Sequence, residues 1–273
     1  MSLERIDGDA EFRAAIAPLI SADPARCTIV ATVSAQRAIH GPFPDDVRHV
    51  VRDGAAVVGA ALRTPPWPIT AITGTGFDED AARVLAAADP GCGGLTGPLA
   101  TVVRFGPVLS AALGRPGRKG MAMWLYRLGE LRSPATTSGE AVQVGPDRVD
   151  ITRRFVAEFA AAVGQPLPEQ GVEQQLAAGR RYLLWLDRGE PVALAGHSPV
   201  IAGSARISYV YTVPGARGRG FGAAVTAATV ESARGAGAAE IVLFADQANP
   251  TSNGIYERLG FDRVDEFGEW RFG

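Results

Sequence analysis

The sequence has few of the residues that build metal sites or disulfide frameworks. It contains two cysteines and three histidines in 273 residues. Cys27 and Cys92 lack the partner spacing of a metal site, and the histidines are scattered along the chain. We therefore expect no metal, and two thiols that are reduced and buried.

Long apolar runs and a strong charge of one sign are also missing. The longest clean apolar runs, such as residues 55–62, are too short to span a bilayer. The first residues, Met1-Ser-Leu-Glu-Arg-Ile-Asp, lack the basic and apolar regions of a signal peptide. The net charge is −2, and residues 1–134 carry 14 basic and 13 acidic groups against 13 and 16 in the remainder. These absences predict a cytoplasmic protein without nucleic-acid or membrane partners.

What is present indicates a globular chain with one or two domains. Hydrophobic residues make up 47% of the chain and charged residues 21%, which is ordinary for globular proteins. The stretch Arg132-Ser-Pro-Ala-Thr-Thr-Ser-Gly139 has the composition of a linker between two patterned regions. We therefore expect one domain at 1–132 and another at 139–273.

Residues 207–222 are the most informative segment. The β-branched and aromatic run Ile207-Ser-Tyr-Val-Tyr-Thr-Val213 predicts a buried strand, which Pro214 ends because it has no N–H. Gly-Ala-Arg-Gly-Arg-Gly-Phe-Gly follows, and then an alanine-rich helix. The N–H groups at the start of a helix lack intrachain partners and lie at the positive end of its dipole. This loop is suited to bind a phosphate or pyrophosphate.

Two other interpretations of the loop are open. Gly218-x-Gly220-x-x-Ala223 fits a relaxed dinucleotide fingerprint, but that fold needs several further strand and helix units. Only about fifty residues remain after the loop. The other interpretation is a glycine-rich turn that caps an ordinary helix.

The segment resembles the pyrophosphate loop of the GNAT superfamily of N-acetyltransferases. That pattern, Arg/Gln-x-x-Gly-x-Gly/Ala, is matched by Arg217, Gly220 and Gly222, and it follows a strand that ends in Val213 and Pro214. A second family signature follows in the expected order, as Asn249-Pro-Thr-Ser-Asn253-Gly-Ile-Tyr256-Glu-Arg-Leu-Gly260-Phe261. The resemblance covers about residues 140–273.

The order of predicted elements agrees with this resemblance. We expect strands at 141–144, 182–186, 192–196, 204–213, 241–245, 261–266 and 269–272, and helices at 147–163, 168–178, 221–234 and 252–259. The first half repeats the order, with strands at 47–52, 57–62, 69–73, near Leu95 and at 121–128, and helices at 78–88 and 98–113. The fold class implied is α+β: two GNAT-like domains, each with a mixed, mostly antiparallel twisted sheet flanked by helices.

The first half lacks an equivalent of the phosphate loop. Thr73-Gly-Thr-Gly76-Phe-Asp-Glu-Asp80 stands in its place, without arginine and with three acidic residues that would repel a pyrophosphate. We expect a degenerate N-terminal domain that has lost the cofactor and shapes the substrate cleft.

The resemblance implies an acyltransferase that moves an acetyl group from acetyl-CoA to a primary amine in a ternary complex. Backbone near Tyr211 and Val213 would bind the pantetheine arm, and a main-chain N–H there would polarise the acetyl carbonyl. Asn249 and Asn253 match positions near that arm, although capping of the last helix is a compatible role. The cofactor-binding residues expected from the resemblance are Tyr211, Thr212, Val213, Arg217, Gly218, Arg219, Gly220, Phe221, Gly222, Asn249 and Asn253.

Tyr256 matches the family tyrosine that faces the sulfur. A phenol of pKa ~10 is protonated at neutral pH and can protonate a departing thiolate. The alternative is an aromatic that only packs on an amphipathic helix. The predicted strand 204–213 has no carboxylate for a general base, so Asp246, Glu169, Glu173 and a chain of water molecules remain open.

The acceptor cannot be read from the sequence; a small-molecule amine and a protein amine are both open, as are a monomer and a homodimer. The alternative function is a CoA-binding regulatory or scaffold protein that performs no transfer.

Overall fold

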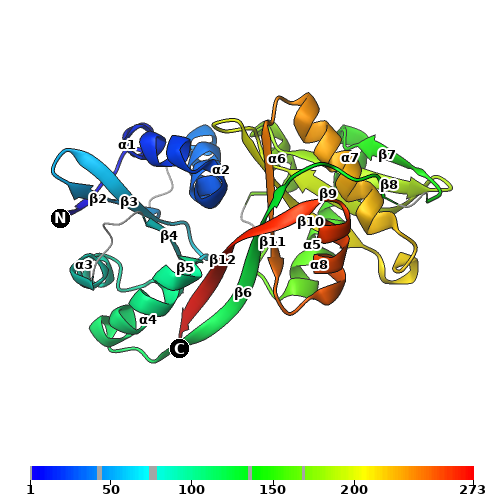
Figure 1. Ribbon diagram of the computed structural model, residues 1–273. Helices are drawn as coiled ribbons and strands as arrows, with labels where there is room; N and C mark the ends of the chain where they lie inside the picture. The colour runs from blue at the N-terminus through cyan, green and yellow to red at the C-terminus, as the bar shows by residue number, and fades with distance from the viewer. Residues whose placement is uncertain (1, 42–44, 74–78, 135–136, 168–169) are drawn as a thin grey trace. The chain divides into compact units, whose positions relative to one another are not determined.

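The computed structural model describes residues 2–41, 45–73, 79–134, 137–167 and 170–273 (Figure 1). Contacts between residues divide the chain into two units: unit 1 comprises Met1–Trp124 and Asp265–Gly273, and unit 2 comprises Leu125–Val264. The sequence predicts one boundary between residues 132 and 139, with everything after it in the second domain. The segment Asp265–Gly273 belongs instead to unit 1.

Unit 1 is a mixed sheet with four helices. Its strands lie in the order β1-β2-β3-β4-β5-β12, and β4 and β5 are parallel while the other described pairs are antiparallel. The strands are β1 (Ser2–Arg5), β2 (Val47–Asp53), β3 (Ala56–Arg63), β4 (Ile69–Thr73), β5 (Gly94–Pro98) and the end of β12 (Phe261–Phe272). The helices are α1 (Asp9–Ala22), α2 (Pro24–His40), α3 (Glu79–Ala88) and α4 (Leu99–Leu113).

No element was expected before residue 47, whereas β1, α1 and α2 lie within residues 2–40. The expected strands and helices that follow are found within a few residues of their predicted ends. The expected acidic loop cannot be assessed, since residues 74–78 lie outside the described residues.

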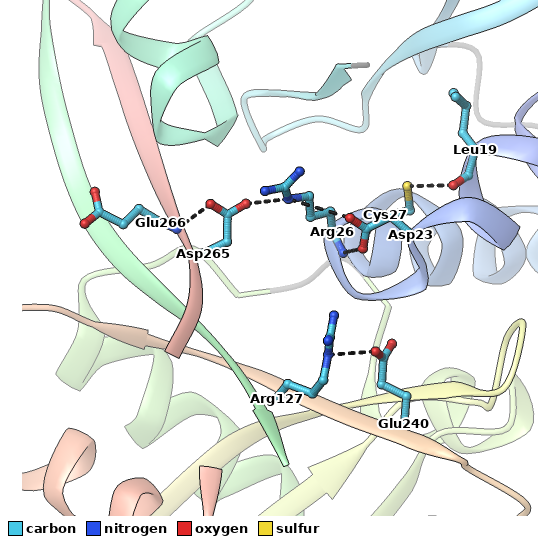
Figure 2. Close-up of polar contacts among 8 residues, drawn as sticks. All are labelled: Leu19, Asp23, Arg26, Cys27, Arg127, Glu240, Asp265 and Glu266. Atoms are coloured by element: carbon cyan, nitrogen blue, oxygen red, sulfur yellow. Dashed lines mark hydrogen bonds and ion pairs between the residues drawn. The ribbon is translucent and has the colours of Figure 1, made fainter. Parts of the chain in front are cut away.

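The end of the chain differs from the prediction of two strands. Phe261–Phe272 is one continuous strand, because β5 offers an unbroken antiparallel partner: Phe267 pairs with Pro98 and Gly268 with Gly97. Arg26 on α2 binds Asp265, with 2.6 Å between Nε and Oδ2 (Figure 2). These contacts explain why residues 265–273 belong to unit 1.

In unit 2 the strand order is β6-β11-β10-β9-β8-β7. The strands β10 and β11 are parallel, whereas β7 to β10 pair antiparallel. Arg127 on β6 binds Glu240 on β11 at 2.9 Å (Figure 2). The strands are the end of β6 (Gly117–Leu128), from Leu125 on, and β7 (Glu140–Gln143), β8 (Arg181–Asp187), β9 (Glu190–His197), β10 (Ser204–Thr212) and β11 (Glu240–Asp246). The helices are α5 (Val149–Val163), α6 (Val172–Ala177), α7 (Phe221–Gly235) and α8 (Pro250–Arg258).

Alternate residues of the strands in unit 2 enter two separate apolar clusters. Tyr182, Leu184 and Leu194 pack with α5 and α6, whereas Leu183 and Ala193 pack with α7. Successive side chains of a strand point to opposite faces, so the helices cover both faces of this sheet. The predicted fold class, α+β with mixed, mostly antiparallel sheets flanked by helices, is confirmed. Within the described ranges, none of the helices has both the length and the apolar composition needed to cross a bilayer.

Candidate acyl-transfer site

Strands β10 and β11 separate halfway along β10. Their parallel pairing runs from Ser204 with Glu240 to Ile207 with Leu243 and ends there among the described residues, although β10 continues to Thr212. A bulge after Ser208 shifts the register with β9, and Tyr209 takes a φ of +58° within it. The second half of β10 therefore has one strand neighbour, β9, and one edge that no described strand covers.

The register with β9 decides which backbone groups face this edge. Tyr211 pairs with Leu194, and the Val213 N–H donates to Val192 O at 3.0 Å. Backbone groups alternate in direction along a strand, so the N–H and C=O of Thr212 point away from β9. The Arg217 side chain confirms this, since its Nε donates to Thr212 O at 3.1 Å. Tyr211 and the Val213 N–H therefore face β9, and Thr212 carries the backbone pair on the exposed edge; which of these residues bind the arm stays a prediction.

The segment after β10 forms the expected glycine turn. Gly218 and Gly220 have φ of +77° and +86°, which only glycine adopts without strain, and α7 starts at Phe221. The first N–H of the helix with a backbone acceptor belongs to Ala224, which donates to Gly220 O. Among the described residues, the N–H groups of 218–223 have no backbone partner. Such a run of N–H groups at a helix start suits an anion; that it holds pyrophosphate stays a prediction.

Arg219 supports the turn from outside. Its Nη2 binds Asp187 Oδ2 at 2.7 Å, and its guanidinium lies 4.7 Å from the Phe221 ring centroid. Thr137 donates to the Arg219 carbonyl at 2.9 Å. The sequence placed Arg219 among the cofactor ligands and missed Thr137 and Asp187, because nothing in the chain order shows that residues 30 to 80 positions away meet there. Phe221 is buried in the core under α7, so only its N–H is available.

We expect Asp187→Asn to lower stability at neutral pH. The hydrogen bond from Ser138 and the pairing with Arg219 hold the pKa of Asp187 below its ordinary value of 3.8. A lowered folded-state pKa stabilises the protein above that value, and the contribution disappears as pH falls through the folded pKa. The urea midpoints of wild type and variant should differ at pH 7 and converge toward pH 3. An equal difference at both pH values would contradict this account.

Gly222 allows three elements to approach closely. A Cβ on Gly222 would lie 3.3 Å from Thr212 Oγ1 and 3.7 Å from Ile255 Cδ1. The first turn of α7 therefore lies beside both the exposed edge of β10 and helix α8. The phosphate turn and the second signature thus meet in space.

The two signature asparagines have structural roles in α8. Asn249 is the N-cap, with its Oδ1 accepting from Ser252 N at 3.1 Å. Asn253 does not open the helix as expected; it is buried, donates to Asp246 O at 3.0 Å and accepts from the Tyr126 hydroxyl at 3.1 Å. Both side chains hold the turn between β11 and α8.

Tyr256 lies in an aromatic cluster. Its ring centroid is 6.0 Å from those of Tyr126 and Phe261, and the residue is 6% exposed. Burial raises the pKa of the Tyr256 phenol above its ordinary value of 10.0, and Tyr126 adds to the shift. The hydroxyl makes no hydrogen bond to any described residue. Tyr256 therefore has the packing of a core aromatic and a proton that it keeps at neutral pH.

The candidate bases are mostly engaged elsewhere. Asp246 Oδ1 accepts from Ala248 N at 2.9 Å, so Asp246 supports its own turn. Glu173 is exposed and paired with Arg153, and Glu169 lies outside the described residues. Glu158 on α5, which the sequence did not single out, interacts with the Tyr211 phenol, whose pKa is raised first by burial and then by this contact. No group of acidic, histidine or cysteine side chains with metal-binding geometry occurs in the described part of the chain.

Comparison with known proteins identifies the family of this site. The sequence profile of the acetyltransferase (GNAT) family matches residues 149–261, which contain the turn, the exposed edge of β10 and α8. A search of curated protein sequences gives no significant match.

Solved structures share the fold over nearly the whole chain. A GCN5-related N-acetyltransferase from Kribbella flavida is 20% identical, with a TM-score of 0.63 over 93% of this chain and 95% of that one. A GNAT-family acetyltransferase from Colwellia psychrerythraea is 12% identical, with a TM-score of 0.57 over 100% of both chains. A tandem GNAT protein from the clavulanic acid biosynthesis pathway is 15% identical, with a TM-score of 0.58 over 98% of both. Residues 149–261 are therefore an acetyltransferase domain of the GNAT family, in a chain whose fold is that of solved GNAT proteins, a tandem one among them.

Proposed function

We propose that the protein transfers the acetyl group of acetyl-CoA to a primary amine, directly and in a ternary complex. The observation that carries the proposal is the continuity of two features within the family match. The run of N–H groups at 218–223 suits the pyrophosphate, and it leads to the exposed edge of β10, where an extended thioester arm can lie as a strand would.

Three groups of the chain would then act on the reaction. The Thr212 N–H and C=O position the arm along β10. A main-chain N–H in the gap between β10 and β11 polarises the acetyl carbonyl while the amine nitrogen forms its bond to the carbonyl carbon. The bond from that carbon to sulfur breaks, and the Tyr256 hydroxyl donates to the departing thiolate. The proton lost by the amine passes to water.

The chain should bind acetyl-CoA with a stoichiometry of one. The segment 217–222 combines arginines with a glycine turn at a helix start, whereas the sequence of the corresponding segment 73–80 is acidic. Titration calorimetry with acetyl-CoA measures this directly. Two sites per chain would contradict the expectation that the N-terminal domain has lost the cofactor.

A thiol-release screen with acetyl-CoA against an amine library tests transfer itself. Release of CoA that depends on both substrates, with an acetylated amine as product, supports the proposal. The alternative is a CoA-binding regulatory or scaffold protein, which the packing of Tyr256 among aromatic rings favours. Binding of CoA without turnover across the library would support a regulator, and no binding of CoA would support a scaffold.

A further inference from the structure

Two arginines of unit 2 lie close together without an acidic partner. Arg180 precedes β8, and Arg206 lies within β10. No described carboxylate lies within 4 Å of either guanidinium, although most arginines of the chain have such a partner. Arg180 is 5% exposed, and its buried Nε has no hydrogen-bond partner among the described residues. A buried guanidinium with an unsatisfied donor is costly unless something else binds it.

Both arginines point to the α5 and α6 face of the sheet. Tyr182 and Ser208 share a register position, since each pairs with Gly196, and residues two positions away from them lie on the same face. Arg180 Nη1 donates to Ser208 Oγ at 2.7 Å. Its guanidinium is 5.2 Å from the Tyr209 ring centroid and 5.9 Å from that of Tyr182. These contacts hold Arg180 in place while leaving its charge uncompensated.

The two charges act on one another. Burial, and then the neighbouring charge of Arg180, lower the pKa of Arg206 to about 10. Paired cations that lack a counter-charge destabilise the folded protein. Sites that keep such groups at the expense of stability are commonly functional.

Arg206 lies next to the point where β10 separates from β11. Arg206 and Ser208 flank Ile207, where the pairing of β10 with β11 ends. The N–H groups assigned to the pyrophosphate begin beyond Thr212, about 17 Å along the strand at ~3.3 Å a residue. The N–H groups proposed for the pyrophosphate and Arg206 therefore lie beyond opposite ends of the exposed edge.

We propose that the acceptor is an amine that also carries an oxyanion, a carboxylate or a phosphate, bound by Arg180 and Arg206. This inference rests on the proposed acyl transfer and specifies its substrate class. An oxyanion would satisfy the unpaired Nε and both charges at once, because the guanidinium fork matches carboxylate and phosphate oxygens. Bound there, the anion directs the amine of the same molecule toward the gap where the acetyl group would lie.

Matched acceptor pairs test the substrate class. The pairs are β-alanine against propylamine, glutamate against its diamide, and O-phosphoethanolamine against ethanolamine. We expect the acidic member of at least one pair to be acetylated with a kcat/KM about 10- to 100-fold higher, the effect of one or two charge-assisted hydrogen bonds. The first two pairs and the third distinguish carboxylate from phosphate. Equal or higher values for the uncharged members in all three pairs would overturn the inference.

Arg206→Met separates a binding role from a structural one. It keeps the length of the side chain and removes the charge, so KM for the acidic acceptor should rise about 10- to 100-fold with little change in kcat. The melting temperature should stay the same or rise, because an uncompensated charge has been removed. The control is Arg181→Met, which removes a charge one position from Arg180 on an exposed side chain of the opposite face. It should leave both quantities unchanged.

A lower melting temperature with an unchanged KM in Arg206→Met would show that Arg206 serves the fold alone. If no amine is acetylated, anion binding is still measurable through the thermal shift produced by inorganic phosphate and by acetate in the CoA-saturated protein. A shift that Arg206→Met removes and Arg181→Met retains would support the arginine site while the transfer proposal fails. No shift in wild type, together with no acidic preference, would overturn the site.

Discussion

Single-turnover transfer by Tyr256→Phe should be about 10²- to 10⁴-fold slower than by wild type, the usual contribution of general acid catalysis. The substitution keeps the ring and its contacts with Tyr126 and Phe261 and removes only the hydroxyl. Because that hydroxyl has no hydrogen bond to the described residues, cofactor affinity and melting temperature should barely change. Rapid-quench measurement of the acetylated amine reports the chemical step even where another step limits turnover.

The pH dependence of the transfer rate gives a second, independent test of Tyr256 as the general acid. Burial raises the pKa of Tyr256 above 10.0, so the phenol stays protonated throughout the neutral and mildly alkaline range. The rate should therefore show no loss from Tyr256 below about pH 10, where an unperturbed phenol would titrate. A fall in the transfer rate above about pH 10 that is present in wild type and absent in Tyr256→Phe would identify the Tyr256 proton as the one that is transferred.

Tyr126→Phe is the matched control. Tyr126 is a buried tyrosine of the same cluster, but its hydroxyl lies within hydrogen-bond distance of Asn253 Oδ1 (3.1 Å) and Glu257 Oε1 (3.3 Å) and accepts from Arg263 Nε at 3.1 Å. Its loss should lower stability by about 2 kcal/mol, because more than one hydrogen bond is lost, and leave the chemical step within a few-fold of wild type. If Tyr256→Phe behaves in the same way, Tyr256 is a packing residue and the leaving thiolate needs no acid.

Gly220→Val should weaken acetyl-CoA binding by about 100-fold or more. Gly220 has a φ of +86°, and a β-branched residue there is strained by about 1–2 kcal/mol, so the turn will relax. Relaxation redirects the N–H groups around it, and loss of two hydrogen bonds to a charged phosphate is about 3 kcal/mol. Steric exclusion by neighbours is not the cause, since the nearest atom to a Cβ at Gly220 is Thr137 Cβ at 3.7 Å. Calorimetry and a urea midpoint measure both effects.

Gly215→Val serves as the comparison. Gly215 lies in the same loop, but an added Cβ would meet no atom within 4 Å and its φ is in the ordinary range. We expect wild-type affinity from this variant. Retained affinity in a folded Gly220→Val would mean that the turn does not bind the pyrophosphate.

The spacing of neighbouring residues was enough to predict the turn at 217–222, the strand before it and the helix after it. Pro214, the glycines and the alanine-rich helix are consecutive, so the positive φ values and the unpaired N–H groups follow from residue types within a few positions. The second signature was located for the same reason, although capping by Asn249 and not by Asn253 depended on where α8 begins.

Features that depend on register or on distant residues were not predictable. The bulge after Ser208 sets which of Tyr211, Thr212 and Val213 faces the exposed edge, and a shift of one residue reverses all three. Arg180 and Arg206 meet only because β9 lies between their strands, and no motif marks them. The single strand Phe261–Phe272 was divided in the prediction because its partner β5 comes about 170 residues earlier.

The late position of strand β12 in the chain affects how unit 1 folds during synthesis. Residues 94–98 emerge from the ribosome long before residues 265–272, their partner along that edge of the sheet. Domains commonly fold as they are made, N-terminal first, yet the first unit here must wait for the last few residues with an unpaired strand edge exposed. A ribosome-bound chain stopped near residue 250 should therefore be more sensitive to protease in its first 124 residues than the released protein.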